Sequence, residues 1–185
     1  TALPGGCVGA SGDQEAAIIV LRKRGMASAA KKASRTTSEG AVGTYIHAGG
    51  KIGVMVEVNC ESDFVARTED FQELLKDIAM HIAATDPRYI RKEDVTPEDM
   101  DREKEIYRAQ AAATGKPANI VEKMLEGKMS KFYEEVCLLE QPFIKDQTLS
   151  IKDIIATKVG KLGENLSVRR FARFKVGEAT FTVAQ

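Results

Sequence analysis

Tryptophan is absent from this chain of 185 residues, and aromatic residues make up only 6% of it. Its cysteines, Cys7, Cys60 and Cys137, lie far apart and form no C-x-x-C pair. This spacing excludes a disulfide framework and a cysteine-rich zinc site, and it is typical of a reducing compartment. No apolar run approaches the roughly 18 residues of a membrane-spanning helix, and residues 1–12 contain no signal-peptide apolar region. We therefore expect a soluble intracellular protein, and its first residue, Thr, indicates a processed or truncated product.

Net charge is also absent, because 27 Lys and Arg residues balance 27 Asp and Glu residues. No overall field therefore attracts the chain to nucleic acid or to an anionic membrane. The two histidines, His47 and His81, are too few to form a metal cluster alone, and His81 flanks the apolar face of a helix, where a packed histidine is expected. Phosphate-binding, nucleophile-elbow and H-E-x-x-H motifs do not occur. We predict no enzyme active site, no metal site and no cofactor.

What the sequence does contain is a β-hairpin pattern. Residues 41–47 and 51–59 have strand character, and a glycine-containing turn separates them. In the second of these strands Ile52, Val54, Val56 and Val58 alternate with other residues, as expected for a half-buried strand. A last strand over residues 165–176 loses its alternation at Arg169 and Arg170, which predicts a β-bulge.

Helical patterns surround these strands. Thr68 is a good N-cap for the clearest helix, which Pro87 closes and whose apolar residues recur on one face. These residues are Phe71, Leu74, Leu75, Ile78, Ala79 and Ile82. Ser150 and Asp153 predict a capping box for the last helix, and Gly163 lies past its end.

A heavily charged helix is predicted from Pro97 to about Thr114, where Gly115 ends it, and it is expected to lie on the surface or to project. The helical stretch from Pro117 is expected to break or kink at Gly127. Near the N-terminus, Asp13 caps a short helix that Gly25 stops.

A second short helical piece covers residues 26–33, and residues 34–38 have linker composition. We expect a partial helical region with its linker over residues 1–38 and a core over 39–185. The fold class is α+β: a small antiparallel sheet of about three strands covered by helices, with a short N-terminal helical piece and a projecting charged helical region.

Asp63, Phe64 and Val65 follow the second strand and precede the helix that Thr68 caps. Two interpretations of this tip remain open. Phe64 and Val65 can anchor the strand-to-helix connection in the core, or the ring and the neighbouring carboxylate can be presented to a partner.

The C-terminal strand also has two interpretations. Its basic residues interleave with Phe171 and Phe174, which is compatible with a stacking platform for RNA or the ribosome. The same pattern is typical of a strand whose aromatic residues face the core while its arginines face solvent. The basic residues are Arg169, Arg170, Arg173 and Lys175.

Two ordered motifs stand out: GVMVEVNCESDFVAR over residues 53–67, and LRKRG over 21–25 followed by AAKKA over 29–33. They resemble two signatures of the elongation factor Ts family, which acts in translation elongation. Further similar segments are IAMHIAA over 78–84, PRY over 87–89, GKMSKF over 127–132, LEQPF over 139–143 and GEN over 163–165. The chain resembles a short, single-core form with an incomplete ubiquitin-associated-like N-terminal domain.

The resemblance implies a function and a set of residues. The chain is expected to exchange guanine nucleotide on elongation factor Tu, with Phe64, flanked by Asp63 and Val65, as a wedge that disturbs the magnesium site of its G domain. His81 matches a family position at the partner contact, and Lys32 matches a basic position implicated in binding. No direct nucleic acid contact is expected. Short forms are expected to form homodimers, in the bacterial cytoplasm or the chloroplast stroma.

Overall fold

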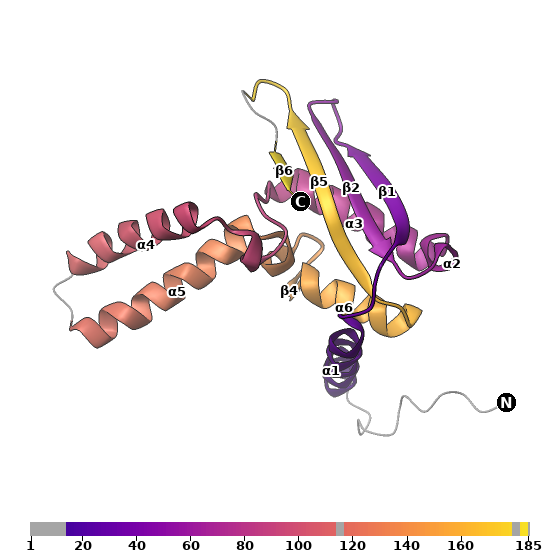
Figure 1. Cartoon of the computed structure of the whole chain (residues 1–185), viewed down its shortest axis with the longest axis horizontal. Helices are drawn as coiled ribbons and strands as arrows, with labels where there is room; N and C mark the ends of the chain where they lie inside the picture. Colours follow the sequence, from indigo (N-terminus) through magenta and orange to yellow (C-terminus); the bar gives the residue numbers. More distant parts are fainter. Residues whose placement is uncertain (1–13, 114–116, 179–181, 185) are drawn as a thin grey trace.

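The computed structural model describes residues 14–113, 117–178 and 182–184. The expected loop over residues 1–12, the cap at Asp13 and the helix stop at Gly115 lie outside these ranges. In the described part, helices cover one side of a small antiparallel sheet, and a pair of helices extends away from it (Figure 1). The predicted α+β class is confirmed.

The main sheet has the order β1-β2-β5-β6, with β1 (Glu39–Ile46), β2 (Ile52–Cys60), β5 (Leu166–Lys175) and β6 (Thr182–Ala184). The expected hairpin is present, since Ile46 pairs with Gly53. The predicted bulge is also present, because Val58 pairs with Val168 and Glu57 with Arg170, which leaves Arg169 as the extra residue. The sheet has one strand more than expected, the short β6. A separate ribbon joins β3 (Pro142–Phe143) to β4 (Asp146–Ser150).

The core lies between the sheet and two helices, α3 (Glu69–Thr85) and α6 (Ile151–Leu162). Both helices begin as expected: Thr68 accepts the Phe71 amide at 3.3 Å, and Ser150 and Asp153 form a complete capping box. The predicted apolar face of α3 is buried against alternate residues of β2, whereas Met55 points away from the core. The buried β2 residues are Val54, Val56 and Val58.

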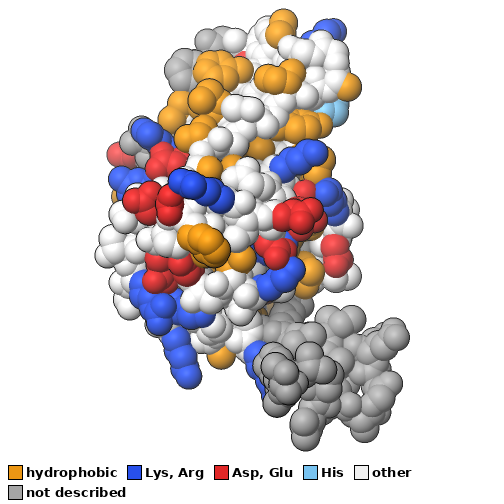
Figure 2. Space-filling model, turned by 90° about the vertical axis from the view of Figure 1, so that its right-hand side faces the viewer, with side chains coloured by type: hydrophobic (Ala, Val, Ile, Leu, Met, Phe, Trp, Pro, Cys, Tyr) orange, Lys and Arg blue, Asp and Glu red, His pale blue; other side chains and the backbone are white. Residues whose placement is uncertain are grey.

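The opposite face of the sheet carries exposed apolar side chains. Strand register sets Ile46, Gly53 and Phe174 side by side in one row and Met55 beside Ala172 in the next. Figure 2 shows hydrophobic side chains gathered over the end of the molecule where the β1–β2 turn lies. The larger exposed members of this sheet face are Val42, Ile46, Met55, Phe174 and Val183.

One continuous helix, α1 (Gln14–Lys32), replaces the two short helical pieces that were expected. The prediction that Gly25 ends a helix is wrong, because Gly25 is buried where α1 packs on α6. A Cβ atom at Gly160 of α6 would lie 3.3 Å from the Gly25 Cα atom. The glycine therefore permits a close helix crossing instead of terminating the helix.

Helices α4 (Pro97–Ala112) and α5 (Ala118–Val136) lie side by side and project from the body of the protein, as expected for the charged region (Figure 1). The expected break at Gly127 is wrong, since α5 runs through it without interruption. A glycine in a helix costs only about 1 kcal/mol relative to alanine, which neighbouring helix formers and packing can outweigh. A small second core closes the base of this pair, next to the short 3-10 helices η1 (Lys92–Asp94) and η2 (Leu138–Glu140).

Candidate partner-binding site

The tip is a single helical turn, α2 (Asp63–Ala66). Ser62 is its N-cap and accepts the Val65 amide at 3.4 Å. Thr68, the cap of α3, also donates its hydroxyl to the Val65 carbonyl at 2.7 Å. Capping side chains on both sides therefore hold a turn that is too short to be stable alone.

Phe64 is 79% exposed, whereas Val65 and Ala66 are each 6% exposed. Because successive helical residues point about 100° apart, one turn can bury two neighbours and direct the third residue to solvent. The core-anchor interpretation is thus correct for Val65 and wrong for Phe64. Asp63 lies beside the ring and pairs with Arg67 at 2.7 Å on the exposed side of the turn. The tip presents a large apolar ring next to a carboxylate.

His81 is fully buried, as the packed-histidine interpretation expected. Its Nε2 atom lies 3.0 Å from Oε1 of Gln141, and this oxygen also accepts the Thr85 hydroxyl at 2.8 Å. Burial lowers the pKa of His81, and the Gln141 hydrogen bond opposes this change. This arrangement keeps the His81 side chain away from the surface of the free chain. The partner contact predicted for His81 stays a prediction.

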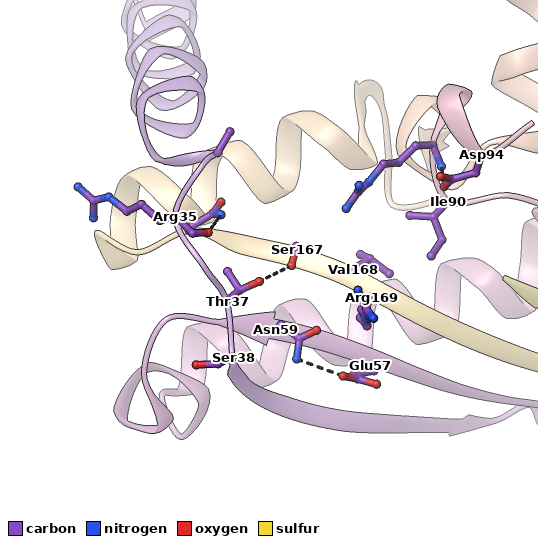
Figure 3. A pocket seen from close by; sticks show the side chains of 13 residues that line it. Arg35, Thr37, Ser38, Glu57, Asn59, Ile90, Asp94, Ser167, Val168 and Arg169 are labelled. Atoms are coloured by element: carbon purple, nitrogen blue, oxygen red, sulfur yellow. Dashed lines mark hydrogen bonds between the residues drawn. The ribbon is translucent and has the colours of Figure 1, made fainter. Parts of the chain in front are cut away.

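Lys32 is the last residue of α1, and its Nζ atom donates to the Ser28 hydroxyl at 3.0 Å. The linker that follows borders a cavity of about 530 Å³, shown in Figure 3. In the wall of this cavity, the hydroxyl groups of Thr37 and Ser167 form a hydrogen bond of 2.9 Å, and the Asn59 side chain donates a hydrogen bond of 3.2 Å to the Glu57 carboxylate. The cavity was not predicted, because segments far apart in the sequence build it.

The C-terminal strand does not form a stacking platform from Phe171 and Phe174. Phe171 is 2% exposed and lies in the core, while Phe174 on the other face is 51% exposed. Arg173 is buried and contacts Asp86 at 3.2 Å, and Arg170 bonds Glu57 at 2.6 Å. The two rings share no surface, so stacking of bases on this pair is not supported.

The two described cysteines, Cys60 and Cys137, are both free thiols and both buried. Burial raises the pKa of the Cys60 thiol and raises that of Cys137 to about 12, so neither is a ready nucleophile. Among the described residues, no three His, Cys, Asp or Glu side chains are grouped so that they could hold a metal ion. Within the same ranges, no helix combines the length and hydropathy needed to cross a membrane.

Comparison with known proteins identifies the family. Residues 26–178 match a family model described as elongation factor TS. A protein named elongation factor Ts from Koribacter versatilis is 74% identical over 175 residues, which is 95% of this chain and 80% of that protein. Relatives of the same name from Solibacter usitatus and Geobacter sulfurreducens are 64% and 60% identical over 93% and 91% of this chain, and over 81% and 78% of their own lengths.

With a fold that presents an aromatic tip, these matches define a translation elongation factor, a component of protein biosynthesis. More particularly, the chain belongs to the elongation factor Ts family. The resemblance noted from the ordered motifs is thereby confirmed. Family membership implies elongation factor Tu as a partner.

Proposed function

We propose that this protein promotes release of GDP from elongation factor Tu by inserting Phe64 into its G domain. The observation that carries the proposal is the exposure of Phe64 on a turn whose other apolar residues are buried. Burying a Phe side chain stabilises a protein by roughly 1.5–3 kcal/mol. Folding of the free chain leaves this free energy unused, so it is available to a complex.

The exchange follows from linkage and needs no covalent step. A wedge that binds the nucleotide-free partner more tightly than the nucleotide-bound partner must weaken nucleotide binding by the same factor. Disturbing the magnesium site removes a large local charge that holds the phosphates. In this proposal Asp63 makes a polar contact with elongation factor Tu beside the ring, and Lys32 makes a second contact. Buried Val65 anchors the turn that carries Phe64.

We include His81 in the proposed contact region, where its buried position suits an indirect role. Its bond to Gln141 holds α3 against the segment after η2, and α3 begins directly behind the tip. The relatives named above are bacterial, which supports action in the bacterial cytoplasm. The chloroplast alternative stays a prediction.

The test is nucleotide release from elongation factor Tu loaded with a fluorescent GDP analogue. Truncation of a hot-spot residue in an interface costs about 2 kcal/mol or more, so Phe64→Ala should slow release by roughly thirtyfold or more at limiting factor. Ile106→Ala shortens another exposed side chain, on α4, and serves as the matched control. Because Phe64 makes little contact with the core, its variant should melt at the parental temperature. A folded Phe64→Ala protein with parental activity would remove Phe64 as the wedge.

We also propose that two copies associate through the exposed apolar face of the sheet. Its Ile46, Met55 and Phe174 side chains are contiguous by strand register, which suits a two-fold interface. Sedimentation velocity should show a dimer that Met55→Glu converts to a folded monomer. A parent protein that sediments as a monomer at tens of micromolar would exclude this interface.

A further inference from the structure

One carboxylate, that of Glu164, holds the base of the tip. Glu164 lies between α6 and β5, and its Oε2 atom accepts the backbone amides of Glu61 at 3.1 Å and Ser62 at 3.0 Å. Its Oε1 atom accepts the Ser62 hydroxyl at 2.6 Å. Ser62 is the N-cap of α2, so three hydrogen bonds donated to Glu164 fix the residues from which the turn carrying Phe64 starts.

A reciprocal hydrogen bond joins the same two loops, because Glu61 in turn binds the loop that contains Glu164. Oε1 of Glu61 accepts the backbone amide of Asn165 at 2.7 Å and pairs with Arg35 at 3.4 Å. The Asn165 side chain in turn donates to the Arg35 carbonyl at 2.9 Å. Each loop therefore supplies a glutamate that binds backbone amide of the other loop, and the linker after α1 is tied to the same point.

These bonds are of the stronger kind, because hydrogen bonds to an ionised carboxylate are roughly twice as strong as those between neutral groups. The turn that they hold has four residues, too few for an independent helix. Its direction relative to the sheet depends on what binds its first residues. Glu164 binds these first residues although it lies 102 positions from Ser62 in the sequence.

We propose that Glu164 is a positioning residue for Phe64: it fixes the orientation of the tip through Ser62 and, with Glu61, couples the tip to the linker after α1. The consequence for nucleotide release rests on the proposed function, whereas the consequence for tip mobility does not. Misplacement of a group by about 1 Å can cost two orders of magnitude in rate. We expect Glu164→Ala to lower the maximal rate of GDP release by roughly tenfold and to change the half-saturating concentration less.

The chain has no tryptophan, so Phe64→Trp places a single tryptophan at the tip, which can be excited selectively over the four tyrosines. In this background Glu164→Ala should lower the tryptophan anisotropy and speed hydrogen exchange at the amides of Glu61 and Ser62. Glu164→Gln keeps one acceptor oxygen and should give an intermediate value. Glu140→Ala is the matched control, because it also removes a partly buried glutamate. Glu140 lies away from the tip, where its carboxylate pairs with the Lys92 Nζ atom at 3.0 Å.

Unchanged anisotropy and exchange protection in folded Glu164→Ala would overturn the proposal. A second result would also overturn the proposal. In it, Glu164→Ala loosens the tip but keeps the parental maximal rate of GDP release, although Phe64→Ala slows release. If Phe64→Ala has no effect on release, the proposed function fails, and the anisotropy still decides whether Glu164 holds the tip. Should Glu164→Ala not fold, the conservative Glu164→Gln must lower the anisotropy in the same direction, and an unchanged value would overturn the proposal.

Discussion

The crossing of α1 and α6 offers a test in which two opposing effects can be weighed. A Cβ atom at Gly25 would lie 3.3 Å from the Ala156 carbonyl oxygen and 3.4 Å from the Thr157 Cα atom. Both neighbours are backbone of another helix, which cannot move aside like a flexible side chain. Gly127 on α5 provides the matched control, because a Cβ atom there would meet nothing within 4 Å.

Replacing a helical glycine by alanine gains about 0.8–1 kcal/mol of helix propensity. At Gly25 the added methyl group costs a shift of a few tenths of an ångström, and we expect these effects to cancel to within about 1 kcal/mol. Leucine has a similar propensity but places a branched side chain between two backbones, where overpacking costs about 1–3 kcal/mol. The steric effect therefore wins, and Gly25→Leu should loosen α1 from α6. Gly127→Leu should stabilise the protein by a few tenths to about 1 kcal/mol.

Hydrogen exchange followed by mass spectrometry distinguishes these outcomes. In Gly25→Leu, amides of α1 should lose protection while those of α3 keep it, because the main core does not depend on the crossing. Gly127→Leu should leave the protection of α1 unchanged. Parental protection of α1 in Gly25→Leu would refute the close crossing and with it the physical reason given for the continuity of this helix.

Two further predictions concern the core. A Cβ atom at Gly43 would lie 2.5 Å from Cγ of buried Leu75, so Gly43→Ala should lower the free energy of unfolding in urea by about 1–3 kcal/mol, and a parental value would contradict this packing. The pKa of His81 is lower in the folded protein than its ordinary value of about 6.5, so the unfolded chain binds the proton more readily. Stability should be independent of His81 above that pH and should fall below it, toward the folded pKa, by at most about 1.4 kcal/mol per pH unit. His81→Gln should lose this slope between about pH 6.5 and 5, and a parent protein equally stable at both values would contradict the assignment.

Much of the fold was predictable because its signals are local. Alternation in β2, the cap at Thr68, the capping box at Ser150 and the bulge at Arg169 each depend on a few neighbouring residues. Continuity of helices through glycine was not predictable, since the local penalty is small and distant packing decides the outcome. Strand β6 was missed for a related reason: its three residues form a strand by pairing with β5.

The site was predictable in part. The motif directed attention to Phe64, but Phe64 and Val65 are both apolar, and composition alone could not tell which one faces the core. The answer depends on whether the segment continues as a strand or turns as a helix, and partners far away in sequence influence that choice. Glu164 belongs to the segment GEN, but nothing local in the sequence indicates that its carboxylate reaches Ser62.

The conformational order of the tip determines how much binding free energy the exposed Phe64 ring can contribute. An apolar ring on a frayed turn would lose much of its binding free energy to the conformational entropy of ordering that turn. Here the Ala66 carbonyl accepts the Gln72 side chain at 2.7 Å, and Thr68 binds the Val65 carbonyl on the same side. At the other end, Glu164 accepts the amides of Glu61 and Ser62. Because side chains hold the backbone on both sides of the turn before any partner arrives, burial of the ring can contribute to the complex with little ordering cost.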